Sequence, residues 1–175
     1  MAHVEVITST KLGSDTSNIT FGSIPQTYKH LMIHGVVRTD RASDFDNLAV
    51  SFSYETDYAD YTSIMMYWST SMNSNSSGRT TGYANWRQAI YCTGDNGDAQ
   101  MFGGYSMWVP NYTDTDVNKT MIGQSVPCKQ AQLVYYPSVF EGDLRNTAAV
   151  TEIKFEPAYG TNLMAGTHLV LYGLK

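Results

Sequence analysis

The stretch ITFGSIPQTYKHLMIHGVVRT, residues 19–39, joins a turn to a strand. Pro25 has no backbone N–H to donate to a β-ladder, and together with Gly22 it predicts a turn over residues 22–28. From His30 onward, the side chains alternate between two faces, as they do on a strand. Leu31, Ile33, Gly35 and Val37 fall on one face, and Met32, His34 and Val36 fall on the other. The stretch therefore predicts a turn that leads into a sheet strand.

The same two-residue period recurs along the chain, whereas the period of an amphipathic helix is nearly absent. Many short strands without intervening helices predict an all-β fold, an antiparallel β-sandwich or jelly roll with very little helix. The expected strands cover residues 4–8, 19–21, 30–37, 48–54, 61–68, 88–91, 101–109, 119–125, 132–136, 149–155 and 167–172. Turn residues separate them, among them Pro137-Ser138 and Glu141-Gly142-Asp143. The expected core comprises Ile24, Leu31, Ile33, Val37, Ile153, Phe155, Leu169 and Leu171.

Length and composition predict one domain over residues 1–175 with a weakly charged surface. Charged residues make up 15 % of the chain, below the roughly 25 % that is usual in soluble domains, and 13 residues are tyrosine. Such a surface suits packing against another protein, or hydrogen bonding to sugars. The net charge of −5 and the absence of a Lys/Arg cluster argue against a nucleic-acid partner. No apolar run is long enough for a signal peptide or a membrane span, so no membrane partner is expected.

Two features of the sequence suggest metal sites, and neither is specific. His30 and His34 would share one face of a strand at a separation of about 13 Å, which is too far for both to bind one ion. The loop GDNGDAQ, residues 94–100, clusters Asp95, Asn96 and Asp98, whose oxygens are ligands that Ca²⁺ prefers. Asp and Asn are also ordinary turn residues, and the spacing does not match an EF-hand. We expect a turn without a metal or cofactor there, with a bound cation as the alternative.

No motif of the chain predicts catalysis. There is no G-x-S-x-G elbow and no glycine-rich phosphate loop at a strand–helix junction. Glu55, Asp57 and Asp60 are the candidates for paired carboxylates of a glycosidase, but sequence alone gives no separation between them. Cys92 and Cys128 are the only cysteines, and we expect two reduced thiols, with a disulfide as the alternative. We therefore expect a protein that is not an enzyme.

The segment STSMNSNSSGRTTG, residues 69–82, is small, polar and almost free of apolar residues. It predicts a long surface loop between two strands. Binding residues are often carried on loops that a rigid scaffold positions, so this loop is also a candidate for contact with a partner. Trp86 would be the energetic anchor, because tryptophan is enriched among residues that dominate interfaces. The candidate partner-binding residues are Asn73, Asn75, Arg79, Tyr83 and Trp86.

Four segments resemble a family of small virion proteins of tailed bacteriophages, common in phages of aquatic bacteria such as the cyanophages. They are ITFGSIPQTYKHLMIHG at 19–35, YSMWVPNYTDTDVNK at 105–119, AAVTEIKF at 148–155 and NLMAGTHLVLYGLK at 162–175. In that family an I-T-F-x-S-I-P-x-T-Y segment leads into a strand, an I-P-N-Y turn follows, and the chain closes with G-S-x-x-L-Y-G. The segments occur here in the expected order. The family's F-N-x-D-x-x-x-N-Y is replaced by FSYETDYADY at 52–61.

The resemblance implies a β-sandwich component of the virion, assembled in the cytoplasm of the bacterial host. Because the sequence starts with methionine and shows neither an adaptor nor a repetitive shaft, we expect a capsid decoration or cement protein on the outside of the particle. The expected partners are other virion proteins, the major capsid protein or tail proteins, and further copies of the chain. The alternative is a receptor-binding module of a tail or head fibre that recognises a host glycan. A glycan depolymerase is a third interpretation.

Overall fold

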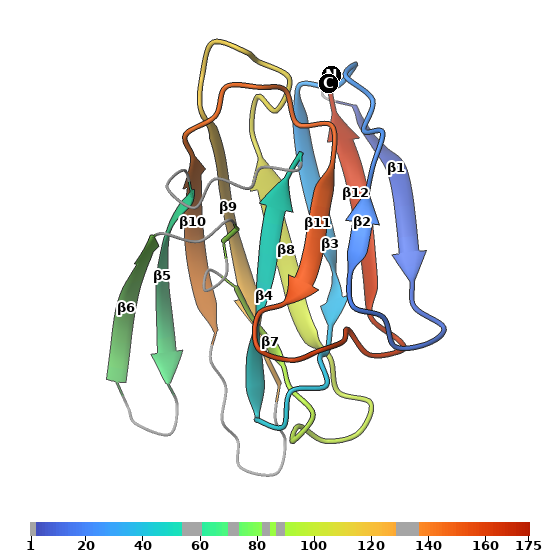
Figure 1. Ribbon diagram of the computed structural model, residues 1–175, viewed down its shortest axis with the longest axis vertical. Coiled ribbons are helices and arrows are strands. Elements are labelled where there is room, and N and C mark those ends of the chain that lie inside the picture. Colours follow the sequence, from blue (N-terminus) through green and yellow to red (C-terminus); the bar gives the residue numbers. More distant parts are fainter. Residues whose placement is uncertain (1–2, 54–60, 70–73, 82–84, 87–89, 129–136) are drawn as a thin grey trace.

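The structure is a computed structural model that describes residues 3–53, 61–69, 74–81, 85–86, 90–128 and 137–175, with the backbone alone at 68–69 and 74–80. All regular elements of these residues are strands, in two antiparallel sheets that pack face to face (Figure 1). The expected all-β sandwich is therefore confirmed. In this described part of the chain, no helix could cross a membrane.

The strands follow one another along the chain without any intervening helix in the described residues. They are β1 (Val4–Lys11), β2 (Ile19–Phe21), β3 (His30–Val37), β4 (Phe45–Phe52), β5 (Tyr61–Ser69), β6 (Ser74–Thr81), β7 (Ile90–Thr93), β8 (Gly103–Val109), β9 (Lys119–Val126), β10 (Ser138–Leu144), β11 (Ile153–Pro157) and β12 (His168–Leu174).

The two sheets differ in size. The large sheet has eight strands in the order β1-β12-β3-β8-β9-β10-β5-β6, and the small sheet has four in the order β2-β11-β4-β7. Figure 1 shows the small sheet in front of the middle and right-hand part of the large sheet, while β5 and β6 extend beyond it. The first and last strands pair with each other, from Val4 opposite Leu174 to Lys11 opposite His168, so the two ends of the chain lie close together.

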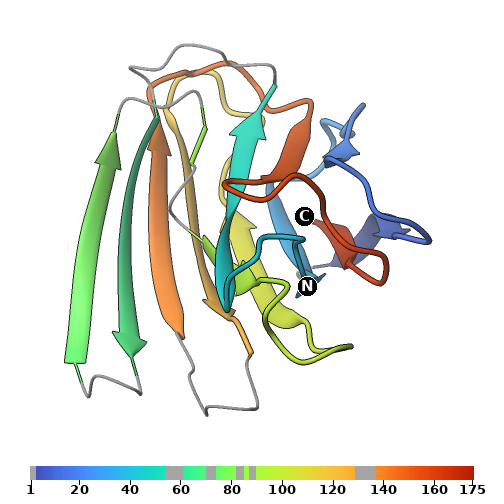
Figure 2. The same cartoon turned by 60° about the horizontal axis from the view of Figure 1, so that its bottom comes forward.

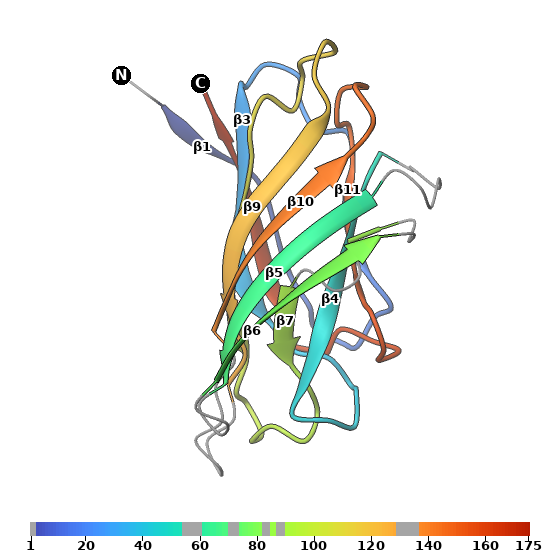
Figure 3. The ribbon, with the colours of Figure 1, turned by 90° about the vertical axis from the view of Figure 1, so that its left-hand side faces the viewer.

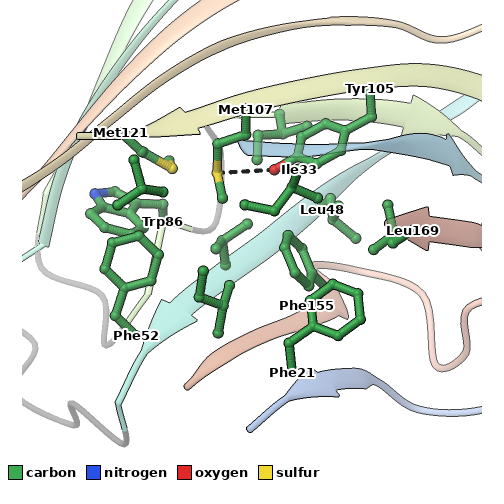
Figure 4. Packing of buried hydrophobic residues seen from close by; sticks show 14 of the residues in the cluster. Phe21, Ile33, Leu48, Phe52, Trp86, Tyr105, Met107, Met121, Phe155 and Leu169 are labelled. Atoms are coloured by element: carbon green, nitrogen blue, oxygen red, sulfur yellow. Dashed lines mark hydrogen bonds between the residues drawn. The ribbon is translucent and has the colours of Figure 1, made fainter. Parts of the chain in front are cut away.

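The core lies between the two sheets and follows the alternation of β3. Leu31 and Ile33 are fully buried, whereas Met32 and His34 on the other face are partly exposed. All eight residues expected in the core are at most 4 % exposed, so that prediction is confirmed. Figure 4 shows how aromatic rings fill the space between the sheets; Phe21 packs edge-on against Phe155, with ring centroids 5.9 Å apart.

The predicted turn over residues 22–28 is also confirmed, since β2 ends at Phe21 and β3 begins at His30. The turn crosses from the small sheet to the large one. Ile24 donates its backbone N–H to the carbonyl of Thr151, and the ring of Tyr28 lies against the backbone of Gly173. A Cβ at position 173 would lie 2.4 Å from that ring, which explains a glycine inside β12.

The expected loop at 69–82 is wrong for most of its length, because β6 occupies residues 74–81. It pairs with β5 from Ser69 opposite Ser74 to Thr62 opposite Thr81. Backbone hydrogen bonds form this ladder whatever the side chains, and a strand at the edge of a sheet needs no apolar face of its own. The absence of apolar alternation therefore did not exclude a strand here.

The expected turn at residues 141–143 is replaced by β10, an interior strand of the large sheet that begins at Ser138, directly after Pro137. Gly142 lies inside this strand because the Trp86 indole packs directly on it. A Cβ at position 142 would lie 2.6 Å from Nε1 of Trp86. Glycine here permits a close approach rather than a turn. The expected strand at 132–136 lies outside the described residues, and the strand expected at 149–155 begins only at Ile153.

Candidate functional site

The outer face of the large sheet carries exposed apolar side chains. The small sheet covers the inner face, and alternate residues of each strand therefore point away from the core. On this outer face Ile122 of β9 is 52 % exposed, Met66 of β5 is 49 % and Ile64 of β5 is 46 %. Val36, Val126 and Val139 are exposed there as well. Figure 3 shows β9, β10 and β5 side by side with β4 behind them. Contiguous exposed apolar patches are typical of surfaces that contact a partner.

Strand register arranges these residues in two rows across the sheet, which we call the outer-face rows. The first row is Tyr172, Met32, Trp108, Ile122, Glu141 and Ile64. The second row is Val170, His34, Ser106, Gln124, Val139 and Met66. Directly opposite residues of this kind have Cβ atoms about 4.5–5.5 Å apart, so their side chains touch. Glu141 is the only acidic or basic residue in the rows besides His34.

Open hollows run between the rows. One of about 400 Å³ is lined by Met32, Trp108, Ile122 and Val139. A neighbouring hollow of about 330 Å³ shares Val139 with the first and is lined also by Ile64 and Met66 on β5. Their walls are mainly apolar, and they are open to solvent along the sheet. This shape accepts side chains that protrude from a partner, rather than enclosing a small molecule on most of its surface.

The two histidines of the opening stretch lie on the outer face, where their neighbours are aromatic rings. Nδ1 of His30 accepts the backbone N–H of Asn111 at 3.1 Å, and its ring lies 5.3 Å from that of Trp108. Burial lowers the pKa of His30, which favours the neutral imidazole. The ring of His34 packs edge-on against Tyr172. Within the described residues, neither belongs to a cluster of metal-ligating side chains.

In the GDNGD loop, a guanidinium group binds the carbonyl oxygens that a cation would use. Nη2 of Arg38 donates to the backbone oxygens of Gly97 at 2.9 Å and of Asp95 at 3.0 Å. Its Nη1 donates to the oxygens of Asp98 at 2.5 Å and Met101 at 3.2 Å. Arg38 is 5 % exposed and follows directly after β3. The geometry favours the turn interpretation over the bound cation, because the positive charge inside the loop comes from the chain itself.

A carboxylate ties together two loops at the same end of the sandwich. Oδ1 of Asp40 accepts the backbone N–H groups of Thr161 at 2.7 Å and Asn162 at 2.9 Å, and Oδ2 accepts the side-chain amide of Asn162 at 3.0 Å. Burial pushes the pKa of Asp40 upward, but the hydrogen bonds outweigh it, so the pKa lies below its usual range. Asp40 is thus a structural acid and has no nucleophile or base among these contacts.

Trp86, expected as a surface anchor, belongs to the core. Its side chain is 0 % exposed, and its ring lies edge-on to Phe52 at 4.6 Å and to Tyr61 at 4.8 Å between centroids. Its Nε1 donates to the carbonyl oxygens of Thr62 at 3.0 Å and Asp143 at 3.2 Å. That expectation is wrong, because the aromatic ring fills the gap between the sheets that Gly142 leaves open.

Of the other candidate partner-binding residues, the structure describes two. Asn73 and Tyr83 lie outside the described residues. Asn75 and Arg79 take positions on β6, opposite Trp68 and Ile64 of β5. They are therefore at the edge of the large sheet and not on a loop.

Both cysteines are free thiols. Cys92 on β7 is buried, and Cys128 is partly buried. Burial raises the pKa of both thiols, which keeps them protonated and weakly reactive. The expected pair of reduced thiols agrees with this arrangement, whereas the disulfide alternative does not.

The outer-face rows were not predicted from the sequence, although a signal for them exists. In the strand 31–37, both faces contain apolar residues, and so do the strands around Ile122 and Ile64. In an antiparallel sandwich each sheet buries only one of its faces. Apolar residues on both faces of neighbouring strands therefore predict an exposed apolar surface once the sandwich is assumed.

Comparisons with known proteins do not indicate a function for this chain. No protein-family model matches the chain, and no curated protein matches its sequence. Among solved structures, the crystal structure of galectin LEC-6 from Caenorhabditis elegans is similar over 95 % of each chain, with 8 % sequence identity and a TM-score of 0.33. A likeness at that TM-score supports no inference about what this chain does.

Proposed function

We propose that the chain is a non-enzymatic structural protein of a tailed-bacteriophage virion, a capsid decoration or cement protein that attaches to the outside of the particle. The observation that carries the proposal is the exposed apolar face of the large sheet, with Ile64, Met66 and Ile122 each nearly half exposed or more. The sequence resemblance to small virion proteins supplies the biological setting.

The chemistry of the outer-face rows suits a static protein contact. Because Ile122 is already about half buried, completing its burial against a partner contributes about half of the roughly 1.5–3 kcal/mol expected for a fully exposed side chain. Several such residues lie within reach of one another. Interface cores are depleted of charge, and Glu141 is the only carboxylate in the rows. The two titratable residues of the rows, Glu141 on β10 and His34 on β3, are three strand positions apart in the sheet and do not form an acid–base pair, and the rows hold no thiol.

A second candidate function is recognition of a host glycan. It is favoured by Trp108 and Tyr172 in the first row, with Met32 between them. Both rings are partly exposed, and the second row adds Ser106 and Gln124 as hydrogen-bonding neighbours. Aromatic rings beside polar side chains are suited to a sugar, which has an apolar face and a hydroxylated rim.

The test uses Ile122→Glu and Val139→Glu, which place charges in the hollow between the rows. Val117→Glu is the matched control, because Val117 is 44 % exposed but lies in the loop before β9. Purified virions produced with each variant are analysed by quantitative mass spectrometry. The proposal expects the two sheet variants to be lost from particles, with melting temperatures close to that of the control.

Normal incorporation of both sheet variants contradicts the proposal. Binding of host polysaccharide is measured in parallel with Trp108→Ala. If this variant loses glycan binding while Ile122→Glu still incorporates normally, the second candidate function replaces the first.

A further inference from the structure

We propose that two copies of this chain pair edge to edge through β6, so that their large sheets join into one across a two-fold axis. Among the residues that the structure describes, β6 is the last strand of the large sheet and pairs with β5 alone. In Figures 1 and 2 it is the outermost ribbon, and no described segment lies on its far side. A strand with one neighbour has backbone N–H and C=O groups along its free edge that a further strand can bind.

The other sheet edges in the described residues are protected, whereas β6 is not. At the opposite edge of the large sheet, β1 has a register shift between Val6 and Thr8, and it carries Glu5 and Lys11. The small sheet ends in β2 with three residues and β7 with four. Bulges, charges and short length are the features by which proteins prevent edge pairing.

β6 is longer than β2 and β7, is more regular than β1 and carries little charge. It has eight residues, SNSSGRTT, with no proline and a single charged residue, Arg79. Its register with β5 runs without a shift over the whole strand. A long, regular and nearly uncharged edge is the form that accepts another strand.

The partner that we infer for this edge is β6 of a second copy of the chain. Two identical antiparallel strands are related by a two-fold axis perpendicular to the sheet, and this axis keeps the outer faces of both sheets on one side. Residues directly opposite each other must have their side chains on the same face of the sheet. The two-fold axis therefore passes midway between one residue and the same residue of the second copy. A register centred on Ser77 sets Arg79 opposite Asn75 of the second copy. One centred on Gly78 sets it opposite Ser77.

Both registers keep Arg79 away from its own counterpart, which avoids the cost of like charges directly opposite each other. In either one, β5 of the two copies would be separated by three strand spacings, about 14 Å. Ile64 and Met66 of both copies would therefore lie near the junction on the same face, and the outer-face rows of the dimer would form one longer surface.

The inference is independent of the proposed function and is tested on the isolated protein by sedimentation equilibrium. An edge contact of this length falls at the small end of protein interfaces, so we expect dimers only at high protein concentration. Ser77→Lys should weaken self-association about tenfold or more, because it puts like charges at or beside the axis. Ser9→Lys, which adds the same charge at an exposed serine of β1, should leave it unchanged.

A charge-reversed variant distinguishes a specific register from a general loss of solubility or folding. In the Ser77-centred register, Ser77→Glu alone is also monomeric, and a mixture of the Lys and Glu variants restores dimers. In the Gly78-centred register, Ser77→Glu faces Arg79 and strengthens the homodimer. Either pattern supports the inference. A wild-type chain that stays monomeric at millimolar concentration overturns it, and so does a dimer that Ser77→Lys leaves intact.

Discussion

The close packing of Trp86 on Gly142 makes Gly142→Ala a sharp test of the core. A Cβ at position 142 would lie 2.6 Å from Nε1 and 2.8 Å from Cε2 of Trp86, and 2.7 Å from Cε of Met121. The methionine methyl group can rotate away. The indole cannot, because its Nε1 donates to the carbonyl oxygens of Thr62 and Asp143 and its ring is held between two other aromatic residues.

The expected cost follows from these contacts. Overpacking of a core costs about 1–3 kcal/mol, and weakening one of the indole hydrogen bonds adds about 1 kcal/mol. Replacing glycine by alanine restricts the unfolded chain and returns about 0.4–1 kcal/mol. The net loss is about 1–3.5 kcal/mol, which lowers the melting temperature by about 2–14 °C for a chain of this size.

Urea unfolding followed by circular dichroism measures the loss, with Gly104→Ala as the matched control. Gly104 lies on β8 in the same sheet, and a Cβ there would have no atom within 4 Å. The control should be as stable as the wild type or slightly more stable. In a Trp86→Leu background, Gly142→Ala should cost at least about 1 kcal/mol less, because the indole atoms that the new Cβ strikes are absent and only the rotatable Met121 methyl group remains. A wild-type stability for Gly142→Ala, or an equal cost in both backgrounds, would refute the packing described here.

Three further predictions concern residues that hold loops and core in place. Arg38→Met should lose about 1.5–3 kcal/mol of unfolding free energy because the GDNGD carbonyls lose a charged donor, and added Ca²⁺ should not restore it; restoration would identify a cation loop. Asp40→Asn should be less stable than the wild type at pH 7. The difference should shrink as the pH falls below about 4, because a lowered folded-state pKa stabilises only while the carboxylate is ionised; a constant difference from pH 7 to 3 would contradict this. Phe155→Ala should cost about 3–5 kcal/mol in the same assay, and a loss below 1 kcal/mol would place the ring outside the core.

The parts of the fold that local patterns determine could be predicted from the sequence. The alternation in β3 identified its buried face, and Pro25 with Gly22 identified the turn before it. These features depend on backbone sterics and on a two-residue period, both of which are visible within a few residues.

The features that were missed depend on contacts between distant segments. The polar β6 is a strand because β5 lies beside it. The glycine of β10, Gly142, leaves room for the indole of Trp86, which is more than fifty residues away in the chain. Glycine between acidic residues is locally a turn signal, and only the packing reverses that interpretation. The polar segment before Trp86 predicts a loop, and a tryptophan beside a surface loop is expected at the surface; pairing with β5 makes most of that segment a strand.

The candidate surface was missed for a similar reason. Alternation assigns Met32 and Ile33 to opposite faces, but whether the face that carries Met32 is covered as well depends on how the two sheets pack. That is a property of the whole chain. The GDNGD loop is ambiguous in sequence because the group that binds its carbonyl oxygens, the guanidinium of Arg38, comes from a residue after β3, almost sixty positions earlier.

Imaging the intact particle at a resolution that separates strands tests the central claim most directly. The account predicts that the chain covers the capsid shell in a copy number set by the shell's symmetry, with the outer-face rows against a capsid subunit. Ile122 and Met66 should then be buried in that contact. A location confined to the tail, with a small copy number that follows its three- or six-fold symmetry, contradicts the account, as does a shell contact that leaves Ile122 exposed to solvent.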